Sequence, residues 1–183
     1  LAKVLHETGE PLAVLHGRAE LGPRALGNRS LLAAPGPGMK ARLNAVKGRE
    51  DYRPVAPICL EDRAAHVFRP GGRDPYMLFE HRPGPGWEDR IPAVVHLDGT
   101  ARLQTLAHDA AGTQAGAILK AYEALSASPV LCNTSANDRG QGFFPDAASA
   151  ARWGRTPFIW SEGVLYVAPD APEAAAQAEG ALA

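Results

Sequence analysis

Residues 12–34 have the sequence LAVLHGRAELGPRALGNRSLLAA, and this stretch decides what kind of fold the chain can adopt. The apolar run of residues 12–16 ends at a glycine, which predicts a short buried strand. Residues 22–27 (GPRALG) are rich in turn-forming glycine and proline, and residues 29–34 (RSLLAA) predict a second strand. Two strands therefore flank a loop that is rich in glycine and arginine.

Outward from this stretch, strand-like and helix-like patterns follow one another along the chain. Helices are predicted for residues 39–46, 61–68, 115–125 and 146–155, and strands for residues 55–60, 76–79, 94–97, 102–106, 130–132 and 164–167. Asp146 after a proline indicates a helix N-cap. Mixed strands and helices predict an α/β or α+β fold, and 183 residues fit one domain. We expect residues 1–170 to form this domain and residues 171–183 to form a flexible tail.

The bulk composition excludes several classes of protein. A formal net charge of −1 argues against a whole-surface binder of nucleic acid or membranes. Two cysteines are too few for a disulfide framework or a cysteine-built zinc site, so we expect a reducing, cytoplasmic compartment. The sequence contains no apolar run of 18 residues. It begins with Leu1, so we expect an excised piece of a longer polypeptide.

The positive charge is concentrated in one segment. Residues 18–53 carry eight basic and three acidic residues, a balance of +5, whereas the rest of the chain carries −6. Arginine binds phosphate oxygens in pairs, and glycine lets the backbone approach an anion closely. The segment therefore predicts an anion site, although it is neither a P-loop nor a G-x-G-x-x-G loop. The competing interpretation is that the arginines pair with acids or face water, as we expect for Lys40 and Arg42.

Two further groups of polar residues are candidates for a site. Residues 133–137 (NTSAN) follow a predicted strand, where side chains often meet ligands, although such a turn can also satisfy its own backbone. His96 and Asp98 would share one face of a strand, but a third metal ligand is missing nearby. Arg102 could reach an anion from the next strand. Cys132 in its apolar run is expected to be inert packing.

Four sequence blocks occur in an order that resembles one enzyme family. They are residues 17–30 (GRAELGPRALGNRS); Leu43-Asn44, Lys47-Gly48-Arg49-Glu50, Arg53-Pro54 and Ala56-Pro57; His96 with Asp98-Gly99-Thr100-Ala101-Arg102; and Asn133-Thr134-Ser135 with Asn137. This pattern is similar to that of the NodU/CmcH-type O-carbamoyltransferases, which include the tobramycin carbamoyltransferase. The resemblance covers residues 17–167, nearly the whole chain.

The resemblance implies both a fold and a reaction. Enzymes of this family have an N-terminal Kae1-like part, which binds a metal through histidines and transfers the carbamoyl group to an acceptor hydroxyl. Their C-terminal part resembles YrdC/Sua5 and makes carbamoyladenylate from ATP and carbamoyl phosphate. This chain is similar to the C-terminal part only. The implied fold is a twisted mixed sheet flanked by helices, with a concave basic surface.

The resemblance also implies the site residues. Arg24, Lys47 and Arg53 would be the catalytic residues, acting by positioning and by neutralising phosphate charge. The substrate- and nucleotide-binding residues would be Arg24, Lys47, Arg49, Arg53, Arg102, Asn133 and Ser135. Arg24 and Lys47 would converge on one triphosphate. Mg²⁺ would arrive with ATP, and a tightly bound metal is not expected in this part. The expected partner is a Kae1-like transferase domain.

Two departures from the family pattern concern the nucleotide base or the acceptor side. Ala136 stands where the family commonly has Phe, and residues 141–143 (QGF) stand where it commonly has Gly-Glu-Pro. Two other functions stay open at this point. One is an RNA-binding module, which the scarcity of aromatic residues near the basic segment disfavours. The other is a noncatalytic scaffold for the transferase part. The acceptor is not encoded in this chain's motifs.

Overall fold

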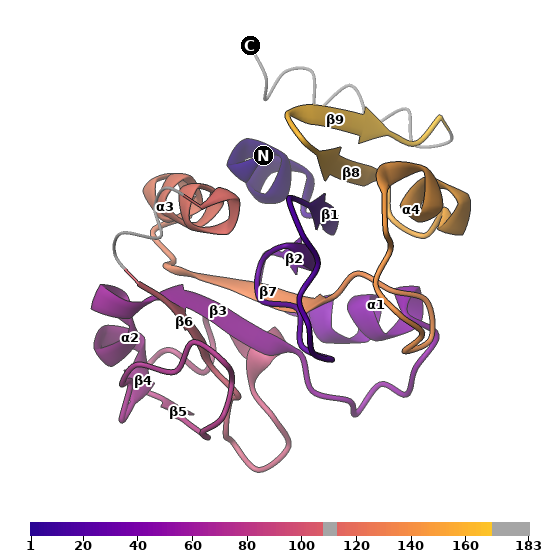
Figure 1. Cartoon of the computed structure of the whole chain (residues 1–183). Helices are drawn as coiled ribbons and strands as arrows, with labels where there is room; N and C mark the ends of the chain where they lie inside the picture. Colours follow the sequence, from indigo (N-terminus) through magenta and orange to yellow (C-terminus); the bar gives the residue numbers. More distant parts are fainter. Residues whose placement is uncertain (108–112, 170–183) are drawn as a thin grey trace.

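The computed structural model describes residues 1–107 and 113–169 (Figure 1). Its centre is a seven-stranded mixed sheet with the strand order β6-β3-β7-β2-β1-β8-β9. The strands of this sheet are β1 (Leu12–Leu15), β2 (Arg29–Ala33), β3 (Ala56–Leu60), β6 (Gln104–Leu106), β7 (Val130–Ser135), β8 (Phe158–Ser161) and β9 (Val164–Val167). A separate small antiparallel pair consists of β4 (Phe68–Arg69) and β5 (Arg82–Pro83).

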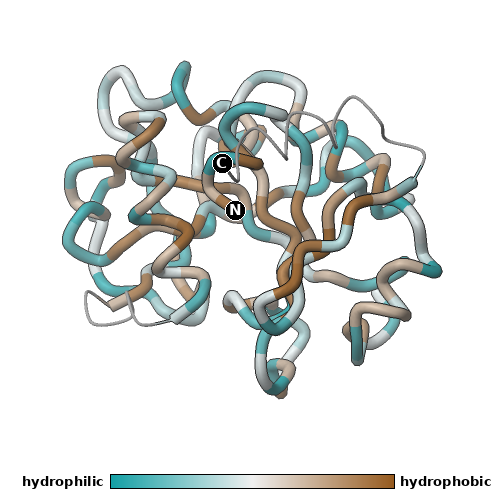
Figure 2. The backbone as a smooth tube through the Cα atoms, turned by 90° about the horizontal axis from the view of Figure 1, so that it is seen from above, coloured by the Kyte–Doolittle hydropathy of each residue, from teal (hydrophilic) through white to brown (hydrophobic). Residues whose placement is uncertain are grey.

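Helices cover both faces of the sheet. They are η1 (Val4–Thr8), α1 (Met39–Val46), α2 (Glu61–Val67), η2 (Pro92–Val94), α3 (Gln114–Ser126) and α4 (Ala147–Trp153). Successive strand residues point to opposite faces, so Ala13 and Leu15 pack with α1, α2 and α4, whereas Leu12 and Val14 pack with η1 and α3. The central strands are therefore apolar on both sides, and they form the brown centre of Figure 2.

The strand register brings distant segments together at one end of the sheet. β7 runs antiparallel to both of its neighbours, with Ser135 opposite Ser30 on β2 and Asn133 opposite Ala56 on β3. The end of β7 therefore meets the beginnings of β2 and β3. The loop that precedes β2 and the segment that precedes β3 must lie beside the polar residues that follow β7. This juxtaposition positions the candidate site.

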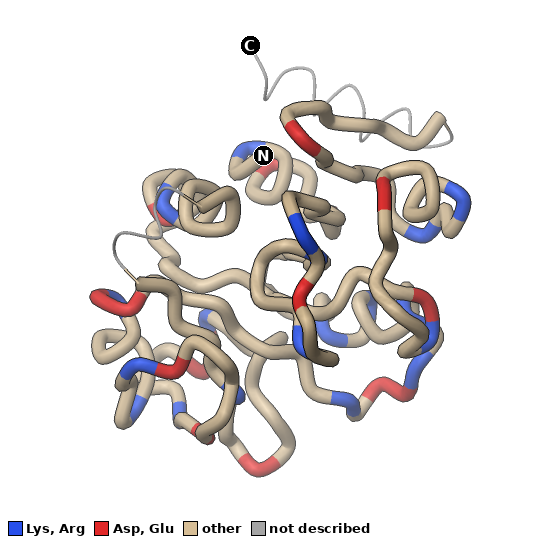
Figure 3. Tube along the Cα trace, in the orientation of Figure 1, with Lys and Arg blue, Asp and Glu red and all other residues tan. Residues whose placement is uncertain are grey.

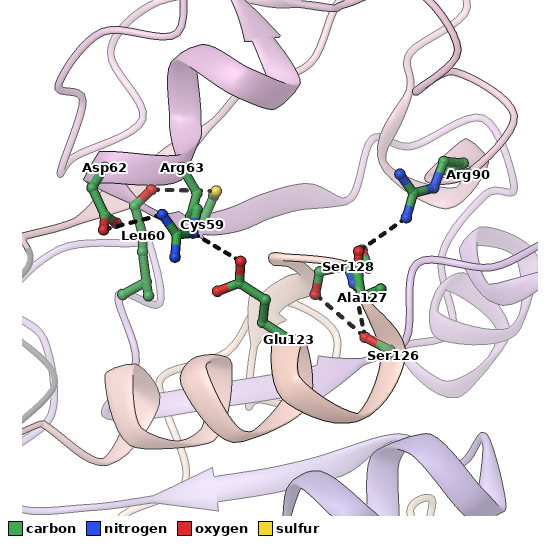
Figure 4. Close-up of polar contacts among 9 residues, drawn as sticks. All are labelled: Cys59, Leu60, Asp62, Arg63, Arg90, Glu123, Ser126, Ala127 and Ser128. Carbon is green, nitrogen blue, oxygen red and sulfur yellow. Dashed lines mark hydrogen bonds and ion pairs between the residues drawn. The ribbon is translucent and has the colours of Figure 1, made fainter.

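Polar contacts hold the helices at their ends. Asp146 caps α4 in a reciprocal capping box with Ser149, as the sequence predicts. α2 is tied to α3 by an ion pair between Arg63 Nε and Glu123 Oε1 at 2.8 Å (Figure 4). In the same view Arg90 donates to the carbonyl of Ala127, just beyond α3, at 2.9 Å. These contacts fasten the helices on opposite faces around the β3–β7 pair.

Most of the predicted elements are confirmed, and α1 has the predicted bounds. The strand predicted for residues 76–79 is wrong. Leu78 and Phe79 donate their backbone N–H groups to the Asp74 carboxylate at 2.8 and 2.8 Å, and Met77 has a φ of 59°, so this segment is a turn. The strand predicted for residues 94–97 is also wrong, because this segment is the end of η2 followed by a turn.

The fold is mixed α/β, as predicted, with helices on both faces of a mixed sheet. The sequence patterns did not predict β8, which pairs in parallel with β1 in the structure. The flexible tail predicted for residues 171–183 lies outside the described residues. In the described part of the chain, no helix is both long and apolar enough to cross a membrane.

Candidate anion site

The loop between β1 and β2 folds around one carboxylate. Oε1 of Glu20 accepts hydrogen bonds from the backbone N–H groups of Leu26 at 2.6 Å, Asn28 at 2.9 Å and Arg29 at 3.4 Å. Gly27, with a φ of 118°, makes the turn between these donors. Arg24 is exposed in this loop. The loop thus presents Arg24 from a backbone that Glu20 has organised.

Two buried amides tie the same loop to the sheet. Gln104 on β6 donates from Nε2 to the carbonyl of Leu26 at 3.0 Å. Asn133 on β7 donates from Nδ2 to the carbonyl of Ala25 at 2.9 Å and to Oε1 of Gln104 at 2.6 Å. Sequence reasoning missed Gln104, because nothing in its local sequence indicates that it contacts a loop 78 residues away.

A third buried amide shapes the segment between α1 and β3. Asn44 on α1 donates from Nδ2 to the carbonyls of Asp51 at 2.9 Å and Arg53 at 3.0 Å. Its Oδ1 accepts from Nε of Arg49 at 2.6 Å. Asn44 is fully buried, and it therefore sets the path of the whole segment. Figure 3 shows basic and acidic residues alternating along this segment after α1.

Lys47, directly after α1, is buried beside the end of β7. Its ammonium group donates to the carbonyl of Ser135, to Oγ of Ser135 at 2.9 Å and to Oδ1 of Asn137 at 2.5 Å. Burial, followed by the nearby charge of Arg49, lowers the pKa of Lys47 to about 7, and the charge of Asp138 opposes this shift. A lysine in such surroundings responds strongly to an arriving negative charge.

These segments enclose two adjoining hollows. The arginine hollow is lined by Arg24, Arg49, Arg102, Asn133 and Ser135, together with Pro23, Ala25, Pro54, Ala56, Met77 and Thr134. The lysine hollow is lined by Lys47, Arg49, Arg53, Ser135 and Asn137, together with Gly48, Glu50, Arg139 and Gly140. Arg49 and Ser135 line both. The structure thus gathers every site residue predicted from the sequence, but it places Arg24 and Lys47 in neighbouring hollows.

The arginine hollow carries uncompensated positive charge. Within the described ranges, no carboxylate lies within 4.0 Å of the guanidinium groups of Arg24, Arg49 or Arg102. Burial and the charge of Arg24 lower the pKa of Arg102. Burial and the charges of Arg53 and Arg102 lower the pKa of Arg49, against a smaller opposing effect of Glu50. Arg53 differs, because it is exposed and paired with Glu50 at 2.7 Å. Three arginines close enough to repel one another suit an anionic ligand.

Other basic residues of the segment have structural partners. Arg29 is 7% exposed, and its guanidinium donates to the backbone carbonyls of His16, Gly17, Asn28, Phe144 and Pro145. Arg42 pairs with Glu10. Lys40 donates to the carbonyl of Val95 at 2.5 Å, so it is bonded and not simply solvated as expected. The net charge of +5 over residues 18–53 therefore includes basic groups that are already bonded within the fold and do not face an anion.

The residues His96 and Asp98 lie in a turn, and the prediction that they share a strand face is wrong. Oγ1 of Thr100 donates to Oδ1 of Asp98 at 2.8 Å and contacts Nδ1 of His96 at 3.1 Å. Burial, followed by the charge of Arg102, lowers the pKa of His96. Within residues 1–107 and 113–169, no three His, Cys, Asp or Glu side chains are placed to hold a metal ion. Cys132 is fully buried, which raises its pKa, as expected for packing.

Comparison with known proteins defines the class to which this fold and site belong. Residues 2–156 match the family described as "Carbamoyltransferase C-terminus", and the chain belongs to this family. Among its relatives, it is 56% identical over 165 residues to nodulation protein U of Sinorhizobium fredii (strain NBRC 101917 / NGR234), covering 90% of this chain and 29% of that protein. The resemblance inferred from the four sequence blocks is confirmed.

Two further relatives extend this comparison. Nodulation protein U of Azorhizobium caulinodans is 59% identical over 159 residues, covering 86% of this chain and 28% of the relative. The 3'-hydroxymethylcephem-O-carbamoyltransferase of Streptomyces clavuligerus is 42% identical over 146 residues, covering 79% and 27%. The chain thus spans less than a third of the length of these relatives.

Proposed function

We propose that this chain is the nucleotide-handling part of an ATP-dependent O-carbamoyltransferase and forms carbamoyladenylate from carbamoyl phosphate and ATP. The observation that carries the proposal is the group of three arginines without a carboxylate partner in the described ranges, Arg24, Arg49 and Arg102, in one hollow. This hollow is joined through Arg49 and Ser135 to the hollow of Lys47. Two adjoining basic hollows suit two substrates that both carry phosphate. The family membership supports carbamoyl transfer as the overall chemistry.

The reaction balances if water takes part in the first step. Water converts carbamoyl phosphate to carbamate and inorganic phosphate. A carbamate oxygen then attacks the α-phosphorus of ATP, and the bond to the bridging oxygen breaks, so pyrophosphate leaves. Arg24, Lys47 and Arg53 would position the two anions and neutralise charge on the transferring phosphate. Mg²⁺ that enters with ATP would supply further neutralisation.

The departures from the family pattern lie outside the two hollows. Ala136 is fully buried in the core, where its carbonyl accepts from the N–H of Phe144 at 3.1 Å. Gln141 and Gly142 are exposed in the turn that follows. Ala136, Gln141 and Gly142 are not among the residues that line the two hollows. They therefore leave the proposed phosphate chemistry in place.

The acceptor hydroxyl would be served by a Kae1-like domain in the remainder of the full-length protein. Met77 lines the arginine hollow, and its neighbours Tyr76, Leu78 and Phe79 are 61%, 71% and 61% exposed. Such adjacent apolar side chains commonly mark an interaction surface. The relatives' greater length supports a further domain that would cover this rim. The relatives' names fit an acceptor that belongs to nodulation-factor, antibiotic or other natural-product synthesis. The reaction would take place in the cytoplasm.

Exchange of labelled pyrophosphate into ATP by the full-length protein, in the presence of carbamoyl phosphate, tests the proposal. We expect exchange in the wild type, and a loss of at least about 100-fold in Arg24→Ala and in Lys47→Met, because electrostatic stabilisation of transferring phosphate is removed. Arg18→Ala is the matched control, since Arg18 is exposed in the same loop but lines neither hollow. Undiminished exchange in Arg24→Ala and Lys47→Met would contradict the assignment.

A further inference from the structure

The turn that follows β7 holds an arginine in a backbone conformation that arginine disfavours. Arg139 has a φ of 45° and Gly140 a φ of 75°, and the N–H of Gln141 donates to the carbonyl of Asp138 at 2.8 Å. This is the pattern of a type I′ turn, whose first central position favours Gly, Asn or Asp over residues with longer side chains. Strained residues of this kind concentrate at ligand-binding sites, which makes the Arg139 side chain a candidate for ligand contact.

The turn is fastened to the fold at its first residue and at the residue before it. Trp153 at the end of α4 donates from Nε1 to Oδ1 of Asp138 at 3.1 Å. Oδ1 of Asn137 accepts from the ammonium group of Lys47 at 2.5 Å. Groups from α4 and from the segment after α1 therefore fix the start of the turn. A backbone fixed in this way can keep the arginine in place despite the steric cost.

Two guanidinium groups converge over Gly48, a residue that lines the lysine hollow. A β-carbon at Gly48 would lie 3.5 Å from Nη1 of Arg155 and 3.8 Å from Nε of Arg139. Both nitrogens therefore lie within 4 Å of one point, so the two side chains can reach a single phosphate group. Arg155 follows α4, whereas Arg139 follows β7, so two separate segments supply this pair.

The two guanidinium groups carry charge that the fold does not neutralise. Among the residues that the structure describes, no carboxylate lies within 4.0 Å of Arg139 or Arg155. Glu50 also lines the lysine hollow, but it is paired with Arg53 at 2.7 Å. Arg155 donates from Nη1 to the carbonyl of Val46 at 3.4 Å, which leaves its other N–H groups available. Two neighbouring cations without an acidic partner suit an anionic ligand.

The position of this pair decides which part of a nucleotide it would meet. Arg49 and Ser135 line both hollows and mark their junction, whereas Arg139 and Gly140 line only the lysine hollow. In the proposed reaction a carbamate oxygen from the arginine hollow attacks the α-phosphorus at this junction. The attacking and leaving oxygens of such a displacement lie roughly in line, on opposite sides of the phosphorus. The leaving pyrophosphate therefore has to extend away from the arginine hollow, towards Arg139.

We propose that Arg139 and Arg155 form a clamp for the β- and γ-phosphates of ATP, which leave together as pyrophosphate. The inference rests on the proposed function, because it assumes that ATP occupies the lysine hollow. When the bond between the α-phosphorus and the bridging oxygen breaks, its electron pair leaves with pyrophosphate. The clamp would neutralise the negative charge that this oxygen gains. AMP lacks both phosphates, so the clamp would favour ATP over AMP.

Arg139→Asn removes the guanidinium without straining the fold, because asparagine accepts a positive φ better than arginine does. The full-length variant should therefore melt at the temperature of the wild type or above it. In calorimetric titrations it should bind ATP roughly 10- to 100-fold more weakly, the usual effect of losing hydrogen bonds between charged groups, and bind AMP as the wild type does. Inorganic pyrophosphate should lose affinity together with ATP. Arg155→Gln should act in the same direction.

Arg152→Gln is the matched control, since it removes the same charge from an exposed position on α4 that lines neither hollow. It should bind all three ligands as the wild type does. ATP or pyrophosphate binding that Arg139→Asn leaves unchanged would overturn the inference, and so would an equal loss for ATP and AMP. These outcomes would leave the proposed function intact. If the wild type bound neither ATP nor carbamoyl phosphate, the proposed function would fail, and the inference with it.

Discussion

Binding of a phosphate ligand should draw a proton onto Lys47. Burial holds the pKa of this lysine at about 7 in the free protein, against an ordinary value of 10.5. A phosphate in the adjoining hollows would favour the charged ammonium and move the pKa back toward its ordinary value. This shift fixes the direction of proton exchange on binding. The free lysine loses its proton as the pH rises through 7, and an anionic ligand restores that proton, so binding takes up protons above pH 7.

The size of the effect follows from the shifted pKa. A group with a pKa of about 7 is about half protonated at pH 7 and about one-tenth protonated at pH 8. Binding of ATP should therefore take up about 0.5 proton at pH 7 and about 0.9 proton at pH 8 if Lys47 becomes fully charged. The phosphates of ATP are already ionised at pH 8, so the ligand itself contributes little to this number.

Calorimetry in two buffers of different ionisation enthalpy measures this uptake, because the observed heat changes in proportion to the protons exchanged. Lys47→Met should abolish the uptake and weaken binding. Lys120→Met removes the same charge from an exposed position on α3 and is the matched control. An uptake close to zero at pH 8 in the wild type, or an undiminished uptake in Lys47→Met, would refute the reasoning.

Four variants separate the residues that position the site from those that would bind the ligand. Arg29→Ala should lower the free energy of unfolding by about 2–4 kcal/mol, because it leaves buried carbonyls unpaired. Arg24→Ala should change the same free energy by less than about 0.5 kcal/mol, because Arg24 is exposed. Denaturant titration of both variants checks this contrast. Asn44→Ala should cost about 1–3 kcal/mol in the same assay and also weaken ATP binding, because the segment that carries Arg49 loses its anchor. Glu20→Ala should release three backbone donors and lower the free energy of unfolding by about 1–3 kcal/mol. Hydrogen exchange at Leu26 and Asn28 should become faster. Unchanged exchange at these two residues would argue against the folding of this loop around Glu20.

The short-range pattern of the sequence determined much of the fold and the family. The apolar run before Gly17 predicted β1, the spacing of residues 39–46 predicted α1, and Asp146 predicted the cap of α4. These features depend on neighbours within a few residues, which a sequence displays directly. The four ordered blocks likewise indicated the carbamoyltransferase family, and every site residue predicted from them lines one of the two hollows.

The tertiary structure alone decided which of these residues are available to a ligand. Arg24 and Arg29 stand five residues apart in one basic stretch, yet Arg24 is exposed, whereas Arg29 is bound by carbonyls from the residues just after β1 and from the segment before α4. Gln104 and its bond to Asn133 became visible only when β6, β7 and the loop before β2 met. The physical reason is that a hydrogen bond is made by whichever groups the sheet register brings into contact, and that register joins residues about 30 to 110 positions apart.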